Sequence, residues 1–529
     1  MKKWIVGLVV LLVVILSVAV LPNFIKDTTI VYEGDNYSAS LMTSSAVKIV
    51  FSKEKTRKME NTVDVIREFD VKLLGIDVGT YSIVERTLGN GAVFLFERLE
   101  NDGLIGFNMR TTINFKAGVD LDTKNWNPIT VDHPHHGVFG EDPTVNPYGR
   151  ITATSEDHTL ELLVGNQYVS KAMVKEYESG NVSKIRELDR EFQDIEVNGN
   201  VISRSAKVGS RNIAESWILV AEEPLFSTED EEDDYIDFAL HNQVSQLNWL
   251  TMDGPYTKLP FSIEPATKMG YGRVIGRIED DVALEWYEKS ASVFFETMVL
   301  NSRVNLLYYI DEFEGTRWPS EYTSTWLGNA YGVRAPYVDT RYNEFVSFFL
   351  DKTANTFKGE VTGAELYVPV YADYLLSRIE VGEIIEAGDG YLIVDYFDED
   401  PKTPVTHASL NHELGGLKVL LTAFSDTGEQ KYMDAAKRVM TGIESFGQED
   451  GGWIRENGDL WYQARPDGTF SGDDYPQLTL LDLLETQKLL EKMKLPRNAY
   501  FDEMIDAKLG YLESEDAELI EKVTNLLEK

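Results

Sequence analysis

Residues 395–424, DYFDEDPKTPVTHASLNHELGGLKVLLTAF, join two different kinds of sequence. The first ten residues are mostly acidic or aromatic and include two prolines, whereas the second half repeats apolar residues at positions i, i+3 and i+4. Proline disfavours a helix just before it, and the 3.6-residue period is typical of a helix. The stretch therefore predicts a loop with polar and aromatic side chains, followed directly by a long helix.

The same helical period recurs throughout the C-terminal half of the chain. Segments with this spacing are residues 281–304, 343–357, 364–379, 410–428, 430–447, 478–493 and 516–529. The turns between them are rich in Tyr, Trp, Asp, Arg and Gly. Helical hairpins with such loops at one end predict an incomplete α/α toroid over residues 239–529, in which the loops form the mouth of a cleft.

The N-terminal half shows a different pattern, with short β-branched or alternating runs separated by Gly, Asn and Asp. These runs include residues 44–52, 91–99, 149–155, 158–165 and 214–223. They predict an antiparallel β-sandwich or barrel domain over residues 24–238, interrupted by helix at residues 170–192. The fold class expected for the chain is thus α+β multidomain.

An acidic run, residues 227–238, lies where the period changes. Six of the seven residues from Thr228 to Asp234 are acidic. This composition favours a solvated linker between the two domains. A calcium loop is the alternative, although the spaced ligands and turn glycine of such loops are missing.

The N-terminus carries two lysines followed by an 18-residue apolar run, Trp4–Leu21. That length suffices to span a bilayer, and the lysines favour a cytoplasmic N-terminus. We therefore expect a single-pass membrane anchor at residues 1–23, with the remaining chain outside the cytoplasm. A cleavable signal peptide is the alternative, because residues 17–19 read as a cleavage site.

The chain of 529 residues carries 88 acidic and 50 basic residues, a formal net charge of -38. Such a surface repels polyanions, so no nucleic-acid partner is expected, and a site for an acidic polymer must be locally basic. The sequence has no cysteine, which excludes disulfides and cysteine-ligated metals.

Three of the seven histidines, His133, His135 and His136, occur in one short segment. They suggest a metal site, but no Glu-x-x-His or i, i+4 spacing accompanies them. Pro134 between them favours a polar loop, so we expect no metal.

Adjacent carboxylates occur at Asp398, Glu399 and Asp400, and again at Asp473 and Asp474. Glycoside hydrolysis needs two carboxyl groups about 5–9 Å apart. The sequence does not give that distance, and adjacent acids in a loop are more often solvated than catalytic.

Residues 453–470, WIRENGDLWYQARPDGTF, predict a β-hairpin around Asn457-Gly458, because Asn-Gly is a favoured two-residue turn. Aromatic rings offer flat faces to sugars, and arginine donates a forked pair of hydrogen bonds to a carboxylate. Such residues here are Trp453, Arg455, Trp461, Tyr462 and Arg465. A hairpin that packs only on its own aromatics is the alternative.

Four short elements follow one another between residues 395 and 488. They are the aromatic-acidic segment with its prolines (Phe397, Asp398, Glu399, Pro401, Thr403, Pro404), Leu410-Asn411, Tyr462-Gln463-Ala464-Arg465, and Asp474-Tyr475-Pro476 before the last long helix. In order and spacing they resemble the C-terminal part of the D-glucuronyl C5-epimerase family. This chain departs from the family at both histidines of the last element, where it has Pro476 and Thr479, and at His412, where the family has glycine.

The resemblance implies a membrane anchor, a β domain and an α/α barrel. It implies epimerisation of D-glucuronate to L-iduronate at carbon 5 within a polysaccharide, by removal and return of a proton. Tyr462, Tyr475 and Glu399 would handle the proton, and Arg465 would bind the substrate carboxylate, which stabilises the carbanion. Further expected substrate-binding residues are Arg455, Trp461, Asn411 and Trp453. No cofactor is expected, and assembly as a homodimer is left open.

Two other functions stay open at this point. One is a polysaccharide lyase or glycoside hydrolase on the same toroid, since a lyase shares the proton abstraction at carbon 5. The other is a non-catalytic glycan-binding protein of the cell envelope, which the missing histidines favour.

Overall fold

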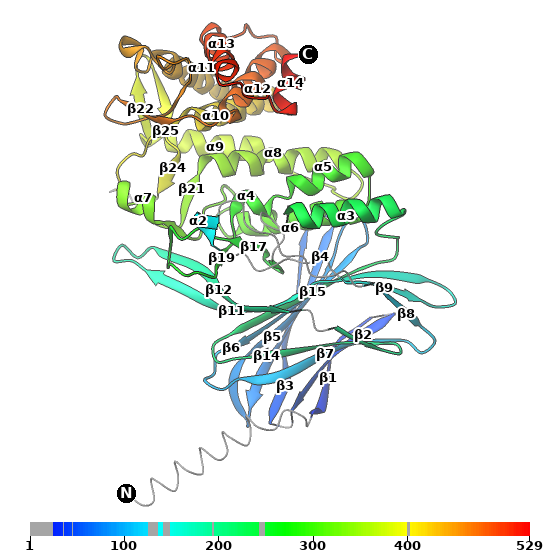
Figure 1. Ribbon diagram of the computed structural model, residues 1–529. Coiled ribbons are helices and arrows are strands. Elements are labelled where there is room, and N and C mark those ends of the chain that lie inside the picture. Colours follow the sequence, from blue (N-terminus) through cyan, green and yellow to red (C-terminus); the bar gives the residue numbers. More distant parts are fainter. Residues whose placement is uncertain are drawn as a thin grey trace, which may run out of the picture. The chain divides into compact units, whose positions relative to one another are not determined.

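The computed structural model describes residues 25–34, 36–44, 46–124, 136–140, 149–192, 195–242, 249–398 and 403–528 (Figure 1). The chain divides into two compact units. Unit 1 comprises residues 1–175, 184–308 and 357–363, and unit 2 comprises residues 176–183, 309–356 and 364–529. Strands dominate the first half and helices the second, so the mixed α and β composition is as predicted. The units do not follow the predicted domain bounds, because the chain on both sides of the acidic run belongs to unit 1.

Unit 1 is built mainly from antiparallel strands in two sheets. One sheet has the order β1-β2-β7-β14-β13, and the main path of the other is β16-β17-β19-β12-β11-β15-β6-β5-β4-β3, with β10, β9 and β8 added beside β15. The strands are β1 Ile25–Glu33, β2 Tyr37–Ser44, β3 Val47–Met59, β4 Thr62–Leu73, β5 Ile76–Thr87, β6 Val93–Asn101, β7 Phe107–Phe115, β8 Asp120–Lys124, β9 Gly149–Thr154, β10 Thr159–Val164, β11 Gln167–Glu176, β12 Val182–Phe192, β13 Ile195–Asn198, β14 Val201–Val208, β15 Ile213–Ala221, β16 Trp249–Thr251, β17 Gly254–Lys258, β18 Ile263–Glu264 and β19 Gly270–Gly272. The helices are α2 His136–Phe139, α3 Glu229–Asn242, α4 Ile275–Ile278, α5 Asp281–Ser290 and α6 Val293–Asp311.

Apolar side chains from both sheets fill the space between them, for example Leu41 and Ile113 from one sheet and Ile83 and Leu162 from the other. The antiparallel pairing within both sheets agrees with the predicted antiparallel β domain, for which a sandwich or a barrel was expected.

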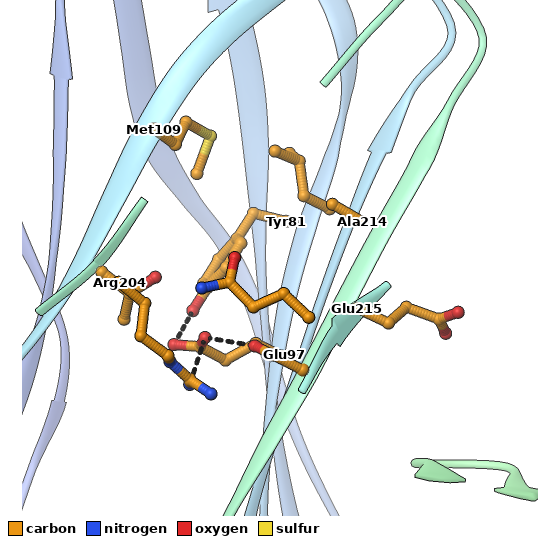
Figure 2. A pocket seen from close by; sticks show the side chains of 10 residues that line it. Tyr81, Glu97, Met109, Arg204, Ala214 and Glu215 are labelled. Carbon is orange, nitrogen blue, oxygen red and sulfur yellow. Dashed lines mark hydrogen bonds and ion pairs between the residues drawn. The ribbon is translucent and has the colours of Figure 1, made fainter. Parts of the chain in front are cut away.

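A polar cluster interrupts this apolar core (Figure 2). The carboxylate of Glu97 accepts hydrogen bonds from Tyr81 (3.1 Å), Arg204 (2.9 Å) and Ser216 (2.9 Å). All four residues are buried. They line a cavity of about 30 Å³, which has room for water but not for a sugar. The Arg204 guanidinium therefore neutralises the Glu97 carboxylate inside the sandwich.

The acidic run is a helix and not a linker. Thr228 Oγ1 accepts a hydrogen bond from the amide of Glu231 (3.2 Å), and the Glu231 carboxylate accepts one from the amide of Ser227 (2.9 Å). This reciprocal capping begins α3, and acidic residues in a first turn interact favourably with the helix dipole. The sequence Thr-x-x-Glu could have predicted it.

Residues 170–192, predicted as helical, instead form the end of β11 and all of β12. The amide of Tyr177 donates to the carbonyl of Asn181 (3.0 Å), which closes a turn at Gly180. The segment is held as strand by the pairing of β11 with β12 and of β12 with β19, because its charged side chains fit a strand with one exposed face as well as a helix.

Unit 2 consists of helical hairpins with short strands between them. Its helices are α7 Thr325–Ala330, α8 Thr340–Thr356, α9 Tyr367–Glu380, α10 Leu410–Thr427, α11 Gln430–Ser445, α12 Leu478–Lys492, α13 Ala499–Ser514 and α14 Glu521–Leu527, with the 3₁₀ turn η1 Gln448–Asp450. Its strands are β20 Thr323–Ser324, β21 Tyr337–Asp339, β22 Ile384–Ala387, β23 Gly390–Ile393, β24 Tyr396–Asp398, β25 Ala408–Ser409, β26 Trp461–Ala464 and β27 Phe470–Asp473.

Helix α10 is the centre of unit 2 and packs against α8, α9, α11 and α12. It is the long helix that the opening stretch predicted, and it ends at Gly428, which adopts φ 73° as a left-handed C-cap. Gly415 allows α8 to approach, because a Cβ there would lie 2.0 Å from Glu344 Oε2. Unit 2 thus has helical hairpins as predicted, and their arrangement as an incomplete α/α toroid stays a prediction.

Several predictions concern residues outside the described part of the chain. These are the anchor at residues 1–23, the loop residues His133 and His135, and Glu399. His136 begins α2. None of the described helices is long and apolar enough to cross a membrane. Within the same residues, no three His, Asp or Glu side chains are grouped so as to hold a metal ion.

Candidate active site

The candidate site forms around Asp395, which directly precedes β24 and is completely buried. Its Oδ1 accepts a hydrogen bond from the amide of Ser409 (2.7 Å), and its Oδ2 accepts one from the Ser409 hydroxyl. Its own amide donates to the carbonyl of His407 (2.9 Å). The loop with the prolines thus folds back, so that the residues before it meet those at the start of α10.

Two histidines lie against the Asp395 carboxylate. His407 Nε2 is 3.1 Å from Oδ2, and His412 Nδ1 is 3.8 Å from Oδ1. His412 Nδ1 also lies 2.8 Å from Thr340 Oγ1. Burial by itself would raise the pKa of Asp395, but the two histidines and the hydrogen bond from Ser409 lower that pKa below its usual value. Asp395 is therefore ionised at neutral pH although it is buried.

Aromatic rings surround His407. Tyr331 is stacked on it with ring centroids 5.6 Å apart, and Trp326 meets it edge to face at 5.4 Å. Tyr396 and Tyr462 lie at 5.8 and 6.4 Å. His407 is completely buried, whereas 48% of Trp326 is exposed. The rings thus join a buried histidine to an exposed, flat aromatic surface.

Tyr462 and Tyr475, thirteen residues apart in sequence, are in contact. Their rings meet edge to face at 5.5 Å, and 45% of Tyr475 is exposed. Burial and the nearby charge of Asp395 raise the pKa of Tyr462 well above its usual value, although a hydrogen bond with Ser409 opposes this. Tyr462 therefore lies near Asp395 and Ser409, and its ring contacts the exposed Tyr475.

Arg465 follows β26, and its side chain is exposed. Within the described residues it forms no ion pair with a carboxylate. Burial raises the pKa of Tyr331, and the charge of Arg465 lowers it in part, which places the guanidinium near that ring. An exposed cation near Tyr331 makes this part of the surface locally basic, as a site for an acidic sugar in this acidic chain must be.

The structure brings together only some of the predicted site residues. Tyr462, Tyr475 and Arg465 belong to the cluster. Asn411 lies at the start of α10 and is buried, and its Oδ1 has no hydrogen-bond partner among the described residues. Glu399 lies outside those residues, so its predicted role is not described further.

Three predicted substrate-binding residues lie elsewhere on the hairpin. Trp453 is fully buried, and its indole N–H donates to the carbonyl of Ile443 (3.1 Å). Since it has no surface to offer a sugar, that prediction is wrong. Arg455 is 4.8 Å above the Trp461 ring and donates to Asp473 (2.7 Å). Arg455 and Trp461 therefore stabilise the hairpin.

The predicted turn at Asn457-Gly458 is present in a short form. Ile454 and Leu460 form an antiparallel bridge across it, the amide of Arg455 donates to the carbonyl of Asp459 (2.8 Å), and Gly458 adopts φ 85°. The longer pairing, between β26 and β27, encloses Asp467-Gly468, which is also a favoured turn dipeptide.

The adjacent acids Asp473 and Asp474 have separate structural contacts. Asp473 is exposed and pairs with Arg455. Asp474 accepts hydrogen bonds from the buried Lys508 (2.8 Å) and from Thr479 (2.5 Å). Thr479, in the position of a family histidine, thus orients a carboxylate. These two acids are not a catalytic pair.

The site also contains residues that were not predicted, among them Asp395, Tyr396, Ser409, Tyr331 and Trp326. Asp395 and Tyr396 open the quoted stretch, and their position before the proline loop was the available signal. Tyr331 and Trp326 belong to a segment about 80 residues from His407 and carry no motif.

No protein-family model and no curated protein matches the chain. Among solved structures, cellobiose 2-epimerase from Bacillus thermoamylovorans is 12% identical, with a TM-score of 0.38, over 54% of this chain and 70% of that one. A family 76 glycoside hydrolase from a bovine Bacteroides thetaiotaomicron strain is 10% identical, with a TM-score of 0.34, over 88% of this chain and 78% of that one. A D-mannose isomerase is 17% identical, with a TM-score of 0.32, over 45% of this chain, and the match spans only 57% of that protein. Likenesses this low decide neither the reaction nor the substrate.

Proposed function

We propose that the protein is a carbohydrate-active enzyme that epimerises D-glucuronate residues of a polysaccharide to L-iduronate at carbon 5. The observation that carries this proposal is the contact between Tyr462 and Tyr475 near the buried Asp395, together with the exposed Arg465 near Tyr331. The four sequence elements shared with the glucuronyl C5-epimerases support the same reaction.

The reaction needs the electron pair of the C5–H bond to move into the substrate carboxylate. Arg465 would bind that carboxylate and stabilise the charge that develops on its oxygens. The exposed face of Trp326 would support a neighbouring sugar ring. The side chains of Arg465 and Trp326 are exposed, whereas those of His407 and His412 are buried.

One proton must leave from one face of the ring, and another must arrive on the opposite face. Tyr462 and Tyr475 touch each other, so we place both on a single face. The raised pKa of Tyr462 keeps it protonated, which suits the group that returns the proton. Tyr475 and Ser409 would then reprotonate Tyr462.

We assign removal of the C5 proton to Tyr331. Burial raises the pKa of Tyr331 above its usual value, and the charge of Arg465 offsets part of this increase, which would favour the phenolate form that this role needs. The stacked His407 holds the ring in place. The rings of Tyr331 and Tyr462 lie 5.6 and 6.4 Å from that of His407, and we place the sugar between their hydroxyl groups.

The test is incubation of the full chain with glucuronate-containing polysaccharides in deuterated water, followed by NMR of carbon 5. Deuterium at carbon 5 together with iduronate signals is the expected result. An unsaturated product that absorbs in the ultraviolet would indicate a lyase, and new reducing ends without that absorbance would indicate a hydrolase. Oligosaccharide binding without deuterium incorporation would identify a glycan-binding protein. Each of the last three results would overturn the proposal.

A further inference from the structure

Several loops of unit 1 gather at one end of its sandwich. The register pairs Ile25 with Ser44 and Val47 with Leu73, so the start of β1 lies at the same end as the β2–β3 and β4–β5 turns. Asn101 pairs with Gly79 at that end, which adds the β6–β7 loop. Figure 1 shows the lower ends of β1 and β3 together.

The tips of these loops carry large apolar side chains that are exposed. Leu74 and Ile76 in the β4–β5 turn are 61% and 70% exposed, and Leu104 in the β6–β7 loop is 78% exposed. Hydrogen bonds tie the two loops to one another, since Asp102 and Gly103 both donate to the carbonyl of Val78 (2.8 and 3.1 Å). The three side chains are therefore neighbours at one end of the unit.

The backbone does not explain a leucine in this turn. Leu74 adopts φ 52°, a conformation in which glycine or asparagine is favoured. Its amide donates to the carbonyl of Ala46 (2.8 Å), a bond that any residue except proline would make. Leu74 therefore has an unfavourable backbone conformation for a leucine, and its apolar side chain is exposed to solvent.

The apolar run Trp4–Leu21 indicates what covers these side chains. Only three residues, 22–24, separate the run from Ile25, and three extended residues span about 10 Å. A bilayer that holds the run therefore has its surface within reach of this end of the sandwich. Once the chain is tethered to the bilayer, weak insertion of a few side chains is enough to hold this end of the sandwich at the membrane surface, because the effective concentration of lipid is high.

We propose that Leu74, Ile76 and Leu104 insert into the surface of the bilayer that holds the N-terminal run. This goes beyond the proposed enzymatic activity and is independent of it. It requires the run to be an anchor. Basic side chains of Lys48, Lys72 and Arg211 lie in or beside the same turns, where they can contact phosphate groups, although Lys72 also pairs with Asp77 (2.8 Å).

The absence of cysteine allows a direct test, because one introduced cysteine is a unique labelling site. We would label Leu104→Cys with an environment-sensitive fluorophore in the full chain, reconstituted into phosphatidylcholine vesicles with and without phosphatidylglycerol. Ala117→Cys is the matched control, since this exposed residue follows β7 at its other end, beyond the pairing of Phe115 with Tyr37. We expect the label at residue 104 to emit at shorter wavelength and to be quenched by nitroxide-labelled lipid in both vesicles, while the label at residue 117 does neither.

Other outcomes would overturn the inference in distinguishable ways. A vesicle-bound chain whose label at residue 104 is not quenched would show that this end does not touch lipid. Equal quenching at residues 104 and 117 would show that the sandwich has no preferred end. A spectral shift that depends on protein concentration without lipid would assign the surface to a second copy of the chain. A chain that does not bind vesicles would refute the anchor as well.

Discussion

Each unit contains a buried carboxylate with three or more polar neighbours, and the neighbours differ in kind. In unit 1, Glu97 accepts from Arg204, Tyr81 and Ser216 (Figure 2). In unit 2, Asp395 faces His407 and His412 and accepts from Ser409. The cationic partner of Glu97 is an arginine, which only donates hydrogen bonds, whereas Asp395 lies against two histidines, whose ring nitrogens can donate or accept.

Access to solvent also separates the two sites. The cavity beside Glu97 has a volume of about 30 Å³ and lies between two sheets. The aromatic cluster around His407 extends through Tyr462 to Tyr475, which is 45% exposed. A carboxylate neutralised by a permanent cation in a closed core can stabilise a fold but cannot pass on a proton. One that touches titratable groups connected to the surface can take part in proton transfer.

Matched tyrosine substitutions give the largest expected contrast between the two sites. Tyr462→Phe should lower the rate of C5 proton exchange by about 10²–10⁴ and leave the melting temperature nearly unchanged, because it removes a proton carrier but keeps the ring. Tyr81→Phe removes a hydrogen bond to Glu97 and should cost about 0.5–1.5 kcal/mol of unfolding free energy without affecting exchange. Exchange is followed by NMR in deuterated water and stability by thermal unfolding. If Tyr462→Phe and Tyr81→Phe exchange the C5 proton at the same rate, Tyr462 is not a proton carrier.

Glu97→Gln tests whether the sandwich cluster is purely structural. The variant leaves the Arg204 guanidinium buried without its counterion, which should lower the free energy of unfolding by about 3–5 kcal/mol. The exchange rate per folded molecule should stay at the parent value. Denaturant unfolding and exchange at a temperature where the variant remains folded measure the two quantities. A stable variant with reduced exchange would instead place Glu97 in a functional site.

Arg465→Ala and Arg455→Ala compare an arginine without an ion pair to one that is paired. Loss of the Arg465 guanidinium should weaken binding of a glucuronate oligosaccharide about tenfold or more, since a hydrogen bond to a charged group contributes about 1.5–3 kcal/mol. Loss of Arg455 removes an exposed pair with Asp473 and should cost less than about 1 kcal/mol of stability, with binding intact. Calorimetric titration separates these results. Weaker binding in the Arg455 variant alone would reverse the assignment of the two residues.

The smallest expected effect is the pH dependence that Asp395 adds to stability. Because its pKa in the folded chain is depressed, its contribution is present above the unfolded pKa of about 3.9 and is lost as the pH falls through the folded pKa. The difference in melting temperature between the parent and Asp395→Asn should therefore shrink as the pH is lowered below about 4. A difference that grows on acidification would mean that the histidines do not stabilise this carboxylate.

Local pattern determined much of this protein before any tertiary contact was known. The 3.6-residue period in residues 410–428 predicted α10, and alternation predicted the strands that enclose the sandwich core. Tyr462, Arg465 and Tyr475 could be selected as site residues because they stand in short elements of recognisable order. Such signals need only neighbouring residues, since a helix or strand presents its faces with a fixed period.

Only the tertiary structure decided which side chains meet and which are hidden. Trp453 and Trp461 belong to one hairpin and look alike in sequence, yet the first is buried in the core and the second packs against Arg455. Tyr331 stacks on His407 from about 80 residues away. Within residues 170–192, Arg186 and Glu187 of β12 pair with Tyr271 and Gly270 of β19, about 80 residues away. In each case the deciding partner is distant in sequence, and local periodicity contains no information about which distant surface a segment will pack against.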